Sequence, residues 1–393
     1  MEMGIQAFDH LSKSNMKQTF DIGIIGGGLA GLTLGILAQK KGFSAVIFEK
    51  EDYPRHKVCG EYISNESLNF LNYLIPGFDF NTLPKVQSLK LTTATNHTLN
   101  ANLDLGGFGI SRFKLDHLLA ETFQNSGGKL LTKTKITSVP KYKTVFEVAV
   151  EKSVYECKAM IGAWGKRSQI DIRLGRDFIQ EKNRALSGFL GIKYHARVNN
   201  FEKDKIQLHL FPGGYCGASS IEDDKVCICY LVDTAAFKKA NSNLSTLEKE
   251  FLFKNKQLEK LFSESAMLFD KRVSISQISF EKKTQTEQGL LMIGDASGMI
   301  APLCGNGMSM AFHEAKIASM VLEKFMNRQI SQEQMLKEYA RIWQKQFGRR
   351  LHTGRFLQRT FFNSNAMNTL IRMANIFPPL KSILIRQTHG VDF

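Results

Sequence analysis

The residues best suited to chemistry in this sequence are three glycines near its start. Gly26, Gly28 and Gly31 follow an apolar run and have the spacing G-x-G-x-x-G. The first permits a tight turn, the second lets backbone N–H groups approach a pyrophosphate, and the third allows a helix to pack closely on a strand. The anion would lie at the helix N-terminus, where unpaired N–H groups and the helix dipole favour negative charge. The spacing therefore predicts a dinucleotide site.

The elements that must position these glycines are readable on either side of them. We expect a buried parallel strand over Phe20–Ile25, a helix over Leu29–Lys41 and a second strand over Ser44–Phe48. Glu49 ends the second strand, 23 positions after Gly26, close to the spacing at which an acidic residue bonds an adenosine ribose. The site favours FAD or NAD over a 2′-phosphorylated cofactor.

A second group of residues with chemical potential lies far away in the chain. Gly294-Asp295 follows a short apolar strand, and Pro302, Gly305 and Gly307 stand at the head of the next helix. A carboxylate at a strand end can hold a ribityl hydroxyl. Glycines at a helix start can bring N–H groups against the pyrimidine edge of a flavin and stabilise negative charge there. Together with the N-terminal glycines, this group predicts a flavin.

The composition is that of an ordinary soluble protein. The 393 residues are 43% hydrophobic and 23% charged, and the first twenty contain no apolar stretch typical of a secretory signal. The apolar run 29–38 is too short to cross a bilayer. Six cysteines form no C-x-x-C pair, and no histidine, cysteine or carboxylate cluster has metal-ligand spacing. We expect a cytoplasmic protein without a metal site.

The order of elements predicts two interleaved domains and a helical tail. The fold class is α/β, with a second, mainly antiparallel sheet inserted into the first domain. A hairpin over 87–105 and several strands over 187–232 supply that sheet, and one amphipathic helix is expected over 244–262. The expected units are a disordered preamble (1–18), the FAD-binding domain (19–85, 106–186 and 273–327), the substrate domain (86–105 and 187–272) and a basic helical segment (328–393).

These motifs resemble those of the p-hydroxybenzoate hydroxylase-type flavoprotein superfamily, in the branch of geranylgeranyl reductases, squalene-type epoxidases and flavin halogenases. The resemblance is carried by Gly26–Gly31 with Glu49, by Arg112, and by the stretch from Gly294 to Gly307. It implies a doubly wound FAD-binding domain of the glutathione reductase type with an inserted substrate sheet. It also implies bound FAD, with Glu49 at the adenosine ribose, Arg112 near the ribityl and pyrophosphate, and Asp295 on the ribityl chain. The cofactor-binding residues are then Gly26, Gly28, Gly31, Glu49, Lys50, Arg112, Asp295, Pro302, Gly305 and Gly307.

Two stretches resemble the geranylgeranyl reductases more narrowly. The loop Pro54–Gly60 is similar to their Lys-x-Cys-Gly loop beside the flavin, which implies catalytic roles for Lys57 and Cys59. The stretch 209–215 is similar to their Phe-Pro-x-Gly motif. The implied substrate-binding residues are His209, Phe211, Pro212 and Tyr215, together with Trp164. That tryptophan replaces the aspartate of the Gly-Ala-Asp-Gly motif of hydroxylases, and a structural role for it is the alternative.

The resemblance implies an FAD-dependent oxidoreductase for an apolar, polyketide-like or lipid-like substrate, free or bound to a carrier. The superfamily as a whole favours a monooxygenase that hydroxylates or epoxidises. The two reductase-like stretches and Trp164 favour the alternative, a carbon–carbon double-bond reductase. A halogenase is disfavoured because the Trp-x-Trp-x-Ile-Pro motif is absent, and a non-catalytic flavin-binding module is a further alternative. No second dinucleotide motif is present, so NAD(P)H would bind transiently as electron donor, or a separate protein would donate the electrons.

The C-terminal segment is strongly basic. Between Arg328 and Arg386 there are eleven Lys or Arg residues and two Glu. Leu336, Tyr339, Trp343 and Phe347 form an apolar stripe at helical spacing beside a row of cations. Two interpretations are open: a helix packed on the FAD domain with a solvated basic face, or a surface for an anionic membrane or an acidic carrier protein, which would place the protein at the inner membrane. No nucleic-acid-binding module is recognisable.

Overall fold

The computed structural model describes residues 16–142, 144–180, 187–269, 271–300, 306–361, 364–377 and 393. The predicted cofactor residues Pro302 and Gly305 lie outside these ranges, as do residues 1–15 and 378–392. The first strand already begins at Met16, so the end of the predicted disordered preamble is wrong: residues 16–18 pair with the strand that starts at Ser153.

The first sheet carries the glycine motif. Its strand order is β16-β17-β9-β1-β2-β6, and β1 pairs in parallel with both β2 and β9. The bounds are β1 Met16–Ile25, β2 Ala45–Phe48, β6 Lys129–Leu131, β9 Ser153–Gly162, β16 Thr286–Glu287 and β17 Leu290–Met292, with β7 Lys141–Tyr142 and β8 Phe146–Val150 added beside β9. The ends of three parallel strands, β1, β2 and β9, therefore meet at the edge that holds the glycine turn.

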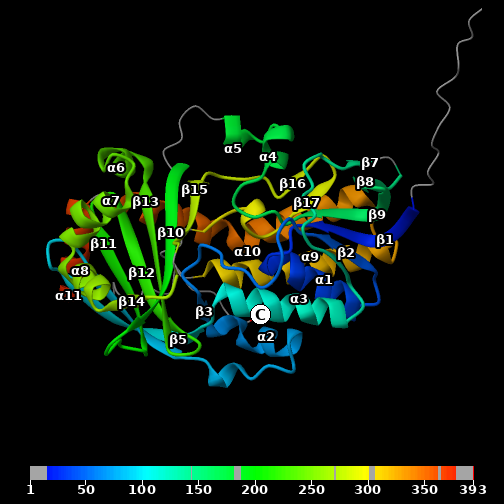
Figure 1. Ribbon diagram of the computed structural model, residues 1–393. Helices are drawn as coiled ribbons and strands as arrows, with labels where there is room; N and C mark the ends of the chain where they lie inside the picture. Colours follow the sequence, from blue (N-terminus) through cyan, green and yellow to red (C-terminus); the bar gives the residue numbers. More distant parts are fainter. Residues whose placement is uncertain are drawn as a thin grey trace, which may run out of the picture.

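Helices cover the first sheet because both bury their apolar residues in one shared core. The helices α1 (Leu29–Lys40), α3 (Arg112–Asn125) and α9 (Gly307–Met326) form one buried core with it, and Figure 1 shows them gathered beneath the strands at the right of the molecule. Three short helices, α2 (Leu68–Leu74), α4 (Gln169–Arg173) and α5 (Asp177–Gln180), lie near its margins. The start of α9 agrees with the prediction from the glycines.

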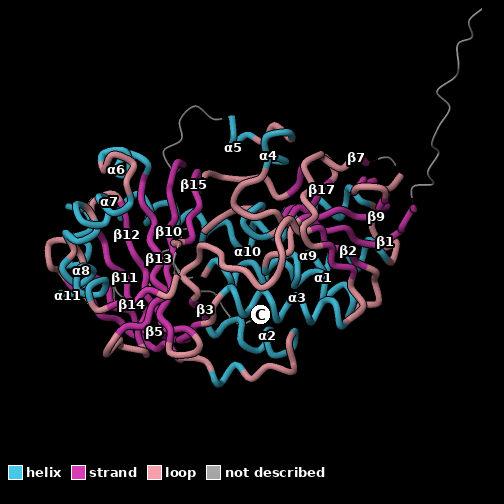
Figure 2. The backbone as a smooth tube through the Cα atoms, viewed as in Figure 1, coloured by secondary structure: helices cyan, strands magenta, loops and turns pink. Residues whose placement is uncertain are grey.

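The second sheet stands at the other end of the molecule (Figures 1 and 2). Its strand order is β14-β10-β13-β12-β11-β4-β5-β3, with β15 also paired to β10, and all neighbours are antiparallel except β11 and β4. The bounds are β3 Tyr62–Ser64, β4 Lys85–Thr92, β5 Thr98–Gly109, β10 Ser187–Val198, β11 Lys205–Phe211, β12 Gly214–Ile221, β13 Lys225–Asp233, β14 Ser265–Met267 and β15 Val273–Ser279. The mainly antiparallel sheet is as predicted.

Both faces of the second sheet are covered. One face packs against α6 (Thr234–Lys239), α7 (Leu244–Glu250) and α8 (Lys256–Ser263). The predicted single helix over 244–262 is wrong, because Asn255 interrupts it and caps α8 by accepting hydrogen bonds from the N–H groups of Gln257 and Leu258. The opposite face, which we call the inner face, looks toward the first sheet and the loop 54–61.

The basic C-terminal segment is helical and folds back on the domain core. Helix α10 (Gln332–Phe361) buries Tyr339, Trp343 and Phe347 of the predicted stripe, and the Tyr339 hydroxyl donates a 2.8 Å hydrogen bond to the carbonyl of Met292. Helix α10 is therefore packed on the FAD-binding domain, as the first interpretation of this segment expects. Helix α11 (Ser364–Ile376) continues to the second sheet. No described helix has the length and hydropathy needed to cross a membrane.

Candidate functional site

The glycine turn between β1 and α1 has the geometry that its sequence predicts. Gly26 has φ +110°, a conformation that favours glycine, and a Cβ there would clash with the carbonyl oxygen of Ala163. A Cβ at Gly31 would clash with the carbonyl oxygen of Gly26, so the third glycine permits the close helix–strand approach. Helix α1 begins directly after Gly28, which has no side chain to cap it. The first N–H groups of α1 thus face an open anion-binding position.

Cationic side chains surround this open position. A Cβ built on Gly28 would lie 3.6 Å from the Lys57 Nζ and 3.9 Å from the Arg112 Nη2. Arg112 is fixed by Asp116, which accepts hydrogen bonds of 2.6 and 2.8 Å from its Nε and Nη2. Burial lowers the pKa of Lys57 to about 8, and Arg112 and Arg55 act in the same direction against the opposing effect of Asp116. A diphosphate near Gly28 would add negative charge beside Lys57 and Arg112.

The two predicted cofactor residues at the end of β2, Glu49 and Lys50, lie in different environments. Glu49 is buried at the end of β2, where it accepts a 2.7 Å hydrogen bond from the Gly27 N–H and pairs with Arg55 at 2.9 Å. It therefore stands beside the glycine turn, at the place expected of a ribose partner. The Lys50 side chain is largely exposed and lies 3.5 Å from Glu51, so the structure gives no packing reason for a cofactor contact there.

The second predicted group forms the other end of the site. Gly294 has φ +63°, and its N–H donates a 2.6 Å hydrogen bond to Glu314 of α9. A shallow hollow is lined there by Gly294, Asp295, Gly298, Ile300, Gly307, Met310, Ala311 and Glu314. The buried Lys283 donates to the Asp295 carbonyl at 2.7 Å and fixes the turn from the other side. Asp295 and Gly307 thus border the same hollow, as the flavin prediction requires.

These two ends fit FAD when they are taken together. The uncapped start of α1 and the cations near Gly28 suit the pyrophosphate, Glu49 suits the adenosine ribose, and Asp295 suits the ribityl chain. Lys57 lies beside Gly28, which suits a phosphate ligand, and its predicted catalytic role stays a prediction. Lys57 lies there because the loop 54–61 runs back over the glycine turn before it reaches the second sheet: Arg55 donates to the Gly27 carbonyl at 3.0 Å.

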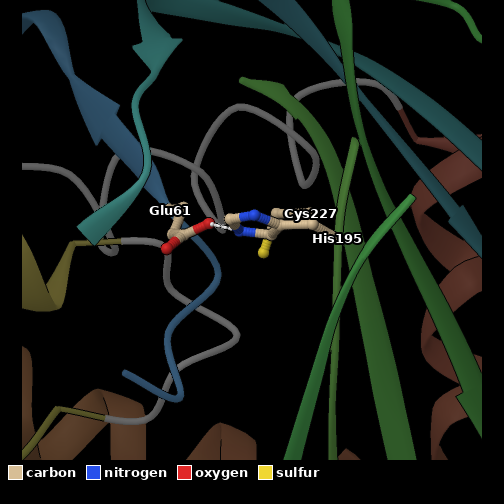
Figure 3. Close-up of side chains that lie close together, drawn as sticks. All are labelled: Glu61, His195 and Cys227. Atoms are coloured by element: carbon tan, nitrogen blue, oxygen red, sulfur yellow. Dashed lines mark hydrogen bonds and ion pairs between the residues drawn. The ribbon is translucent and has the colours of Figure 1, made fainter. Parts of the chain in front are cut away.

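A buried charged cluster joins this loop to the inner face of the second sheet (Figure 3). Glu61 accepts a 2.6 Å hydrogen bond from Lys193 Nζ on one oxygen and lies 2.5 Å from His195 Nε2 on the other. The Arg112 N–H also donates to Glu61, at 2.7 Å. Burial by itself would raise the pKa of Glu61, but Lys193 and His195 outweigh it and hold that pKa at about 2. Glu61 is therefore ionised, and His195 Nε2 donates a hydrogen bond to its carboxylate.

Cys227 completes the arrangement drawn in Figure 3. Its Sγ, the Glu61 carboxylate and the His195 Nε2 lie within 4.8 Å of one another, a set of atoms that could hold a metal ion. Two ligands of one tetrahedral Zn²⁺ would be about 3.3 Å apart, given bonds of about 2.0 Å. The 2.5 Å separation of Glu61 and His195, and the ammonium of Lys193 on the same carboxylate, are instead those of a hydrogen-bonded ion cluster.

Cys59 lies at the junction of the two sheets. The thiol of Cys227 lies 3.3 Å from the Cys59 carbonyl, and the Ser219 hydroxyl donates to the next carbonyl, that of Gly60, at 3.0 Å. Cys59 itself is half-buried. The structure thus places this predicted catalytic residue between the FAD-binding elements and the inner face, where a substrate would have to lie to meet a flavin.

The predicted substrate residues do not all share one face. Leu210, Tyr215 and Leu231 are directly opposite one another on β11, β12 and β13 and belong to an apolar cluster on the inner face. Tyr215 therefore lies on the inner face, and its role in substrate binding stays a prediction. His209 and Phe211 have the other strand parity and point to the outer face.

The outer-face positions are structural in character. His209 is bonded to Thr92 at 2.8 Å and to Gln207 at 3.1 Å, and burial lowers its pKa to about 3. Phe211 packs in the core formed with α6, α7 and α8, and Pro212 follows it at the turn. This placement is a correction to the prediction that His209 and Phe211 line the substrate cavity. Its cause is the alternation of side chains along a strand.

Trp164 occupies a structural position in the first domain. Its indole N–H donates a 3.0 Å hydrogen bond to Asp171, and its ring packs with the apolar cluster on the side of the first sheet away from α1. Asp171 in turn accepts from Arg176 at 2.8 Å, and Arg176 donates to the Ala296 carbonyl at 2.9 Å. Trp164 is therefore linked to the Asp295 turn through Asp171 and Arg176. These contacts are those of a structural tryptophan, the alternative to substrate binding.

Several site residues had no local signal in the sequence. Lys193, His195 and Cys227 are separated from Glu61 by more than 130 residues and come together only through the order of the strands. The groups that fix the Asp295 turn, Lys283 and Glu314, were missed for the same reason. The sequence offers one local signal for this cluster. Lys193 and His195 are polar residues at alternate positions of a mostly apolar strand, so they share one face of it.

The fold and the site together define an FAD-dependent oxidoreductase. Comparison with known proteins agrees: the model of the FAD binding domain family matches residues 19–351, and the chain belongs to that family. Its cofactor is FAD. The chain is 25% identical over 359 residues to the digeranylgeranylglycerophospholipid reductase of Methanocaldococcus jannaschii, covering 84% of this chain and 83% of that one.

Two further comparisons show the breadth of the family. The kynurenine 3-monooxygenase of Flavobacterium johnsoniae is 21% identical over 340 residues, covering 79% of this chain and 74% of that one. The crystal structure of a geranylgeranyl bacteriochlorophyll reductase-like protein from Thermoplasma acidophilum has the same fold, with a TM-score of 0.75 at 18% identity, over 94% of this chain and 100% of that one. The relatives therefore include flavoenzymes that differ in reaction.

Proposed function

We propose that this protein reduces a carbon–carbon double bond in an apolar, lipid-like or isoprenoid substrate. The observation that carries the proposal is the position of Cys59, on a segment held at once by the FAD-binding elements and by the inner face of the second sheet. The likeness to the archaeal digeranylgeranylglycerophospholipid reductase supports the same substrate class.

The inner face suits an apolar chain. Its buried cluster combines residues of the second sheet with Met299 near the flavin end and with α11, and its members are Leu91, Leu99, Phe189, Leu208, Leu210, Tyr215, Leu231, Ile278, Phe280, Met299, Met367, Ile371 and Ala374. A substrate that enters among these residues would meet hydrocarbon side chains, so an apolar molecule would be bound in preference to a polar one, which would lose its hydrogen bonds to water there. Polar groups are concentrated instead at the loop 54–61, where the substrate would meet the flavin.

The chain's own groups have separable tasks in this reaction. Bound FAD supplies the two-electron chemistry, so the protein has to bind, orient and protonate. Arg112, Lys57 and the start of α1 hold the phosphates. Saturating a double bond needs a proton as well as a hydride, and we assign its donation to the Cys59 thiol because the Cys59 backbone lies between the two sheets. Glu61, fixed by Lys193 and His195, holds the backbone that carries this thiol.

Monooxygenation is the second candidate. It is supported by the likeness to kynurenine 3-monooxygenase, and it would use the same cradle and the same apolar face. The two candidates differ in their need for dioxygen and in the atoms that the product gains.

An anaerobic assay separates the candidates. We would reduce the holoprotein with dithionite under argon and add digeranylgeranylglycerophospholipid as the probe, then analyse the product by mass spectrometry. The expected result is a gain of hydrogen atoms in pairs without oxygen. Cys59→Ala should lose most turnover while retaining FAD, and Cys216→Ala, which removes a buried thiol on the outer face, should keep both. Turnover only in air, with oxygen in the product, would overturn the reductase proposal.

A further inference from the structure

Helix α11 is buried on the side that faces the second sheet and exposed on the opposite side. At its C-terminal end the exposed residues are large and apolar. We infer that this end is a membrane-binding surface that takes anionic lipid and brings the apolar inner face of the second sheet to the bilayer. The inference deepens the proposed function, on which it rests for the lipid nature of the substrate. Membrane binding can nevertheless be measured without turnover.

The inner side of α11 is fixed to the second sheet. Met367, Ile371 and Ala374 are at most 2% exposed and pack into the inner-face cluster. Polar contacts to the β4–β5 hairpin hold the helix in this orientation: Asn368 to Thr95 at 3.0 Å, Arg372 to His97 at 3.0 Å, and Asn375 to the Thr98 carbonyl at 3.0 Å. The orientation of α11 is therefore determined, and so is the set of residues that it presents to solvent.

The outer side presents large apolar residues. Met373 is 55% exposed, Ile376 is 82% exposed and Phe377 is 59% exposed. These three fall within five consecutive positions, whereas the other large exposed apolar residues of the described chain are single or in one pair. A concentrated apolar patch at the end of a helix is costly in water and marks an interaction surface.

The charge of the two C-terminal helices favours an anionic partner. From Tyr339 to Ile376, helices α10 and α11 contain seven Lys or Arg residues and neither Asp nor Glu. Arg372 is exposed beside Met373, and Arg341, Lys345 and Arg349 are exposed along α10. Basic residues next to exposed Ile, Phe and Met side chains are the combination by which interfacial helices bind anionic bilayers, the cations meeting headgroups and the apolar groups inserting below them.

A bilayer fits these residues better than an acidic carrier protein. A carrier would be recognised by the cations alone, and it would leave Ile376 and Phe377 in water. A membrane accounts for the charge and for the apolar residues together. Because the other side of α11 covers the inner-face cluster, docking through this end would also place that cluster next to the source of a lipid substrate.

The test is co-sedimentation of the holoprotein with vesicles. Vesicles of phosphatidylcholine mixed with phosphatidylglycerol should bind it, vesicles of phosphatidylcholine alone should bind it weakly, and added salt should reduce the binding. The triple variant Met373→Ser, Ile376→Ser and Phe377→Ser should lower the partition coefficient about tenfold or more. Arg372→Glu should lower it several-fold.

Matched controls lie elsewhere on the surface. Ile172→Ser removes an apolar residue with 55% exposure on α4, and Lys152→Glu reverses an exposed charge at the β8–β9 turn, both far from α11 in Figure 1. Neither should change binding. No binding by the wild type, or equal binding by the triple variant, would overturn the inference, and so would binding of an acyl carrier protein in place of vesicles.

Turnover of detergent-dispersed substrate separates this inference from the proposed function. If turnover persists in a wild type that does not bind vesicles, the membrane surface is wrong and the reductase proposal stands. If vesicles bind but no substrate is reduced, the membrane surface stands and the reductase proposal is wrong. The triple variant should keep its FAD and its turnover in detergent, because its three residues face solvent.

Discussion

Replacing Lys193 with Met should destabilise the protein strongly, and the reason lies in the buried cluster around Glu61. The Lys193 and Glu61 side chains are fully buried, with 2.6 Å between Nζ and Oε1. The substitution keeps most of the side-chain volume but leaves the Glu61 carboxylate with His195 and the Arg112 N–H only. Removing one partner of a buried ion pair costs about 3–5 kcal/mol. We expect a loss of this size in the free energy of unfolding at neutral pH.

The pH dependence gives an independent measure of the same effect. The pKa of Glu61 falls from 4.5 to about 2 on folding, which corresponds to about 3 kcal/mol of stability. Because the folded-state pKa is the lower one, this stability is fully present above pH 4.5 and is lost as the pH falls toward 2. Without Lys193, burial raises the pKa of Glu61. The difference between wild type and variant should therefore shrink as the solution is acidified below pH 4.5.

Urea denaturation of the holoproteins, followed by circular dichroism, would measure these quantities. Glu61→Gln in the Lys193→Met background should recover part of the loss, because it removes the unpaired charge. Lys203→Met is the matched control: it breaks a 2.6 Å pair with Asp224 in which both side chains are mostly exposed, and no measurable loss is expected. A loss below about 1 kcal/mol for Lys193→Met, or one that does not vary with pH, would refute the account of this cluster.

Two other predictions concern the ends of the FAD site. Gly28→Val should fold normally but lose its yellow colour, with FAD affinity at least tenfold lower by fluorescence titration, because the new side chain would occupy the phosphate position beside Lys57. Gly60→Ala, with no atom within 4 Å of its added Cβ, is the control. Burial raises the pKa of Glu314 well above its usual range, so Glu314→Gln should keep FAD across neutral pH, whereas Glu314→Ala should lose about 1–3 kcal/mol through the unpaired Gly294 N–H. Equal stability of the two Glu314 variants in urea would contradict this.

The elements that sequence predicted well are those with a strong local pattern. The strand–turn–helix around Gly26, the β4–β5 hairpin and the start of α9 at Gly307 depend on residues within one or two turns of each other. The apolar pattern over 129–139 alone predicts a longer strand than β6, which ends at Leu131. Local apolar composition does not show where a pairing partner ends, and β6 can extend only as far as β2, whose last paired residue is Phe48.

The candidate site was predictable at the cofactor and much less so at the substrate. Glycines and acidic residues at a nucleotide site act through their own backbone conformation or strand end, so their spacing carries the information. The Glu61 cluster depends on the register of β10, which places Lys193 opposite Cys229 and His195 opposite Cys227. That register follows from the packing of two sheets and a loop, and no short stretch of sequence encodes it.

Strand β11 shows most clearly why the substrate face could not be read in advance. A sheet with one solvated face has alternating apolar and polar residues, and the alternation identifies the buried side. Residues 207–211 of β11 are all buried, because α8 covers one face and the loop 54–61 and α11 cover the other. Apolar residues are then required at both parities. The motif that contains Phe211 was read correctly as part of a buried strand, yet its neighbour Leu210 is the residue that faces the flavin side. If the substrate binds on the inner face as proposed, it therefore meets the residues between those of the motif.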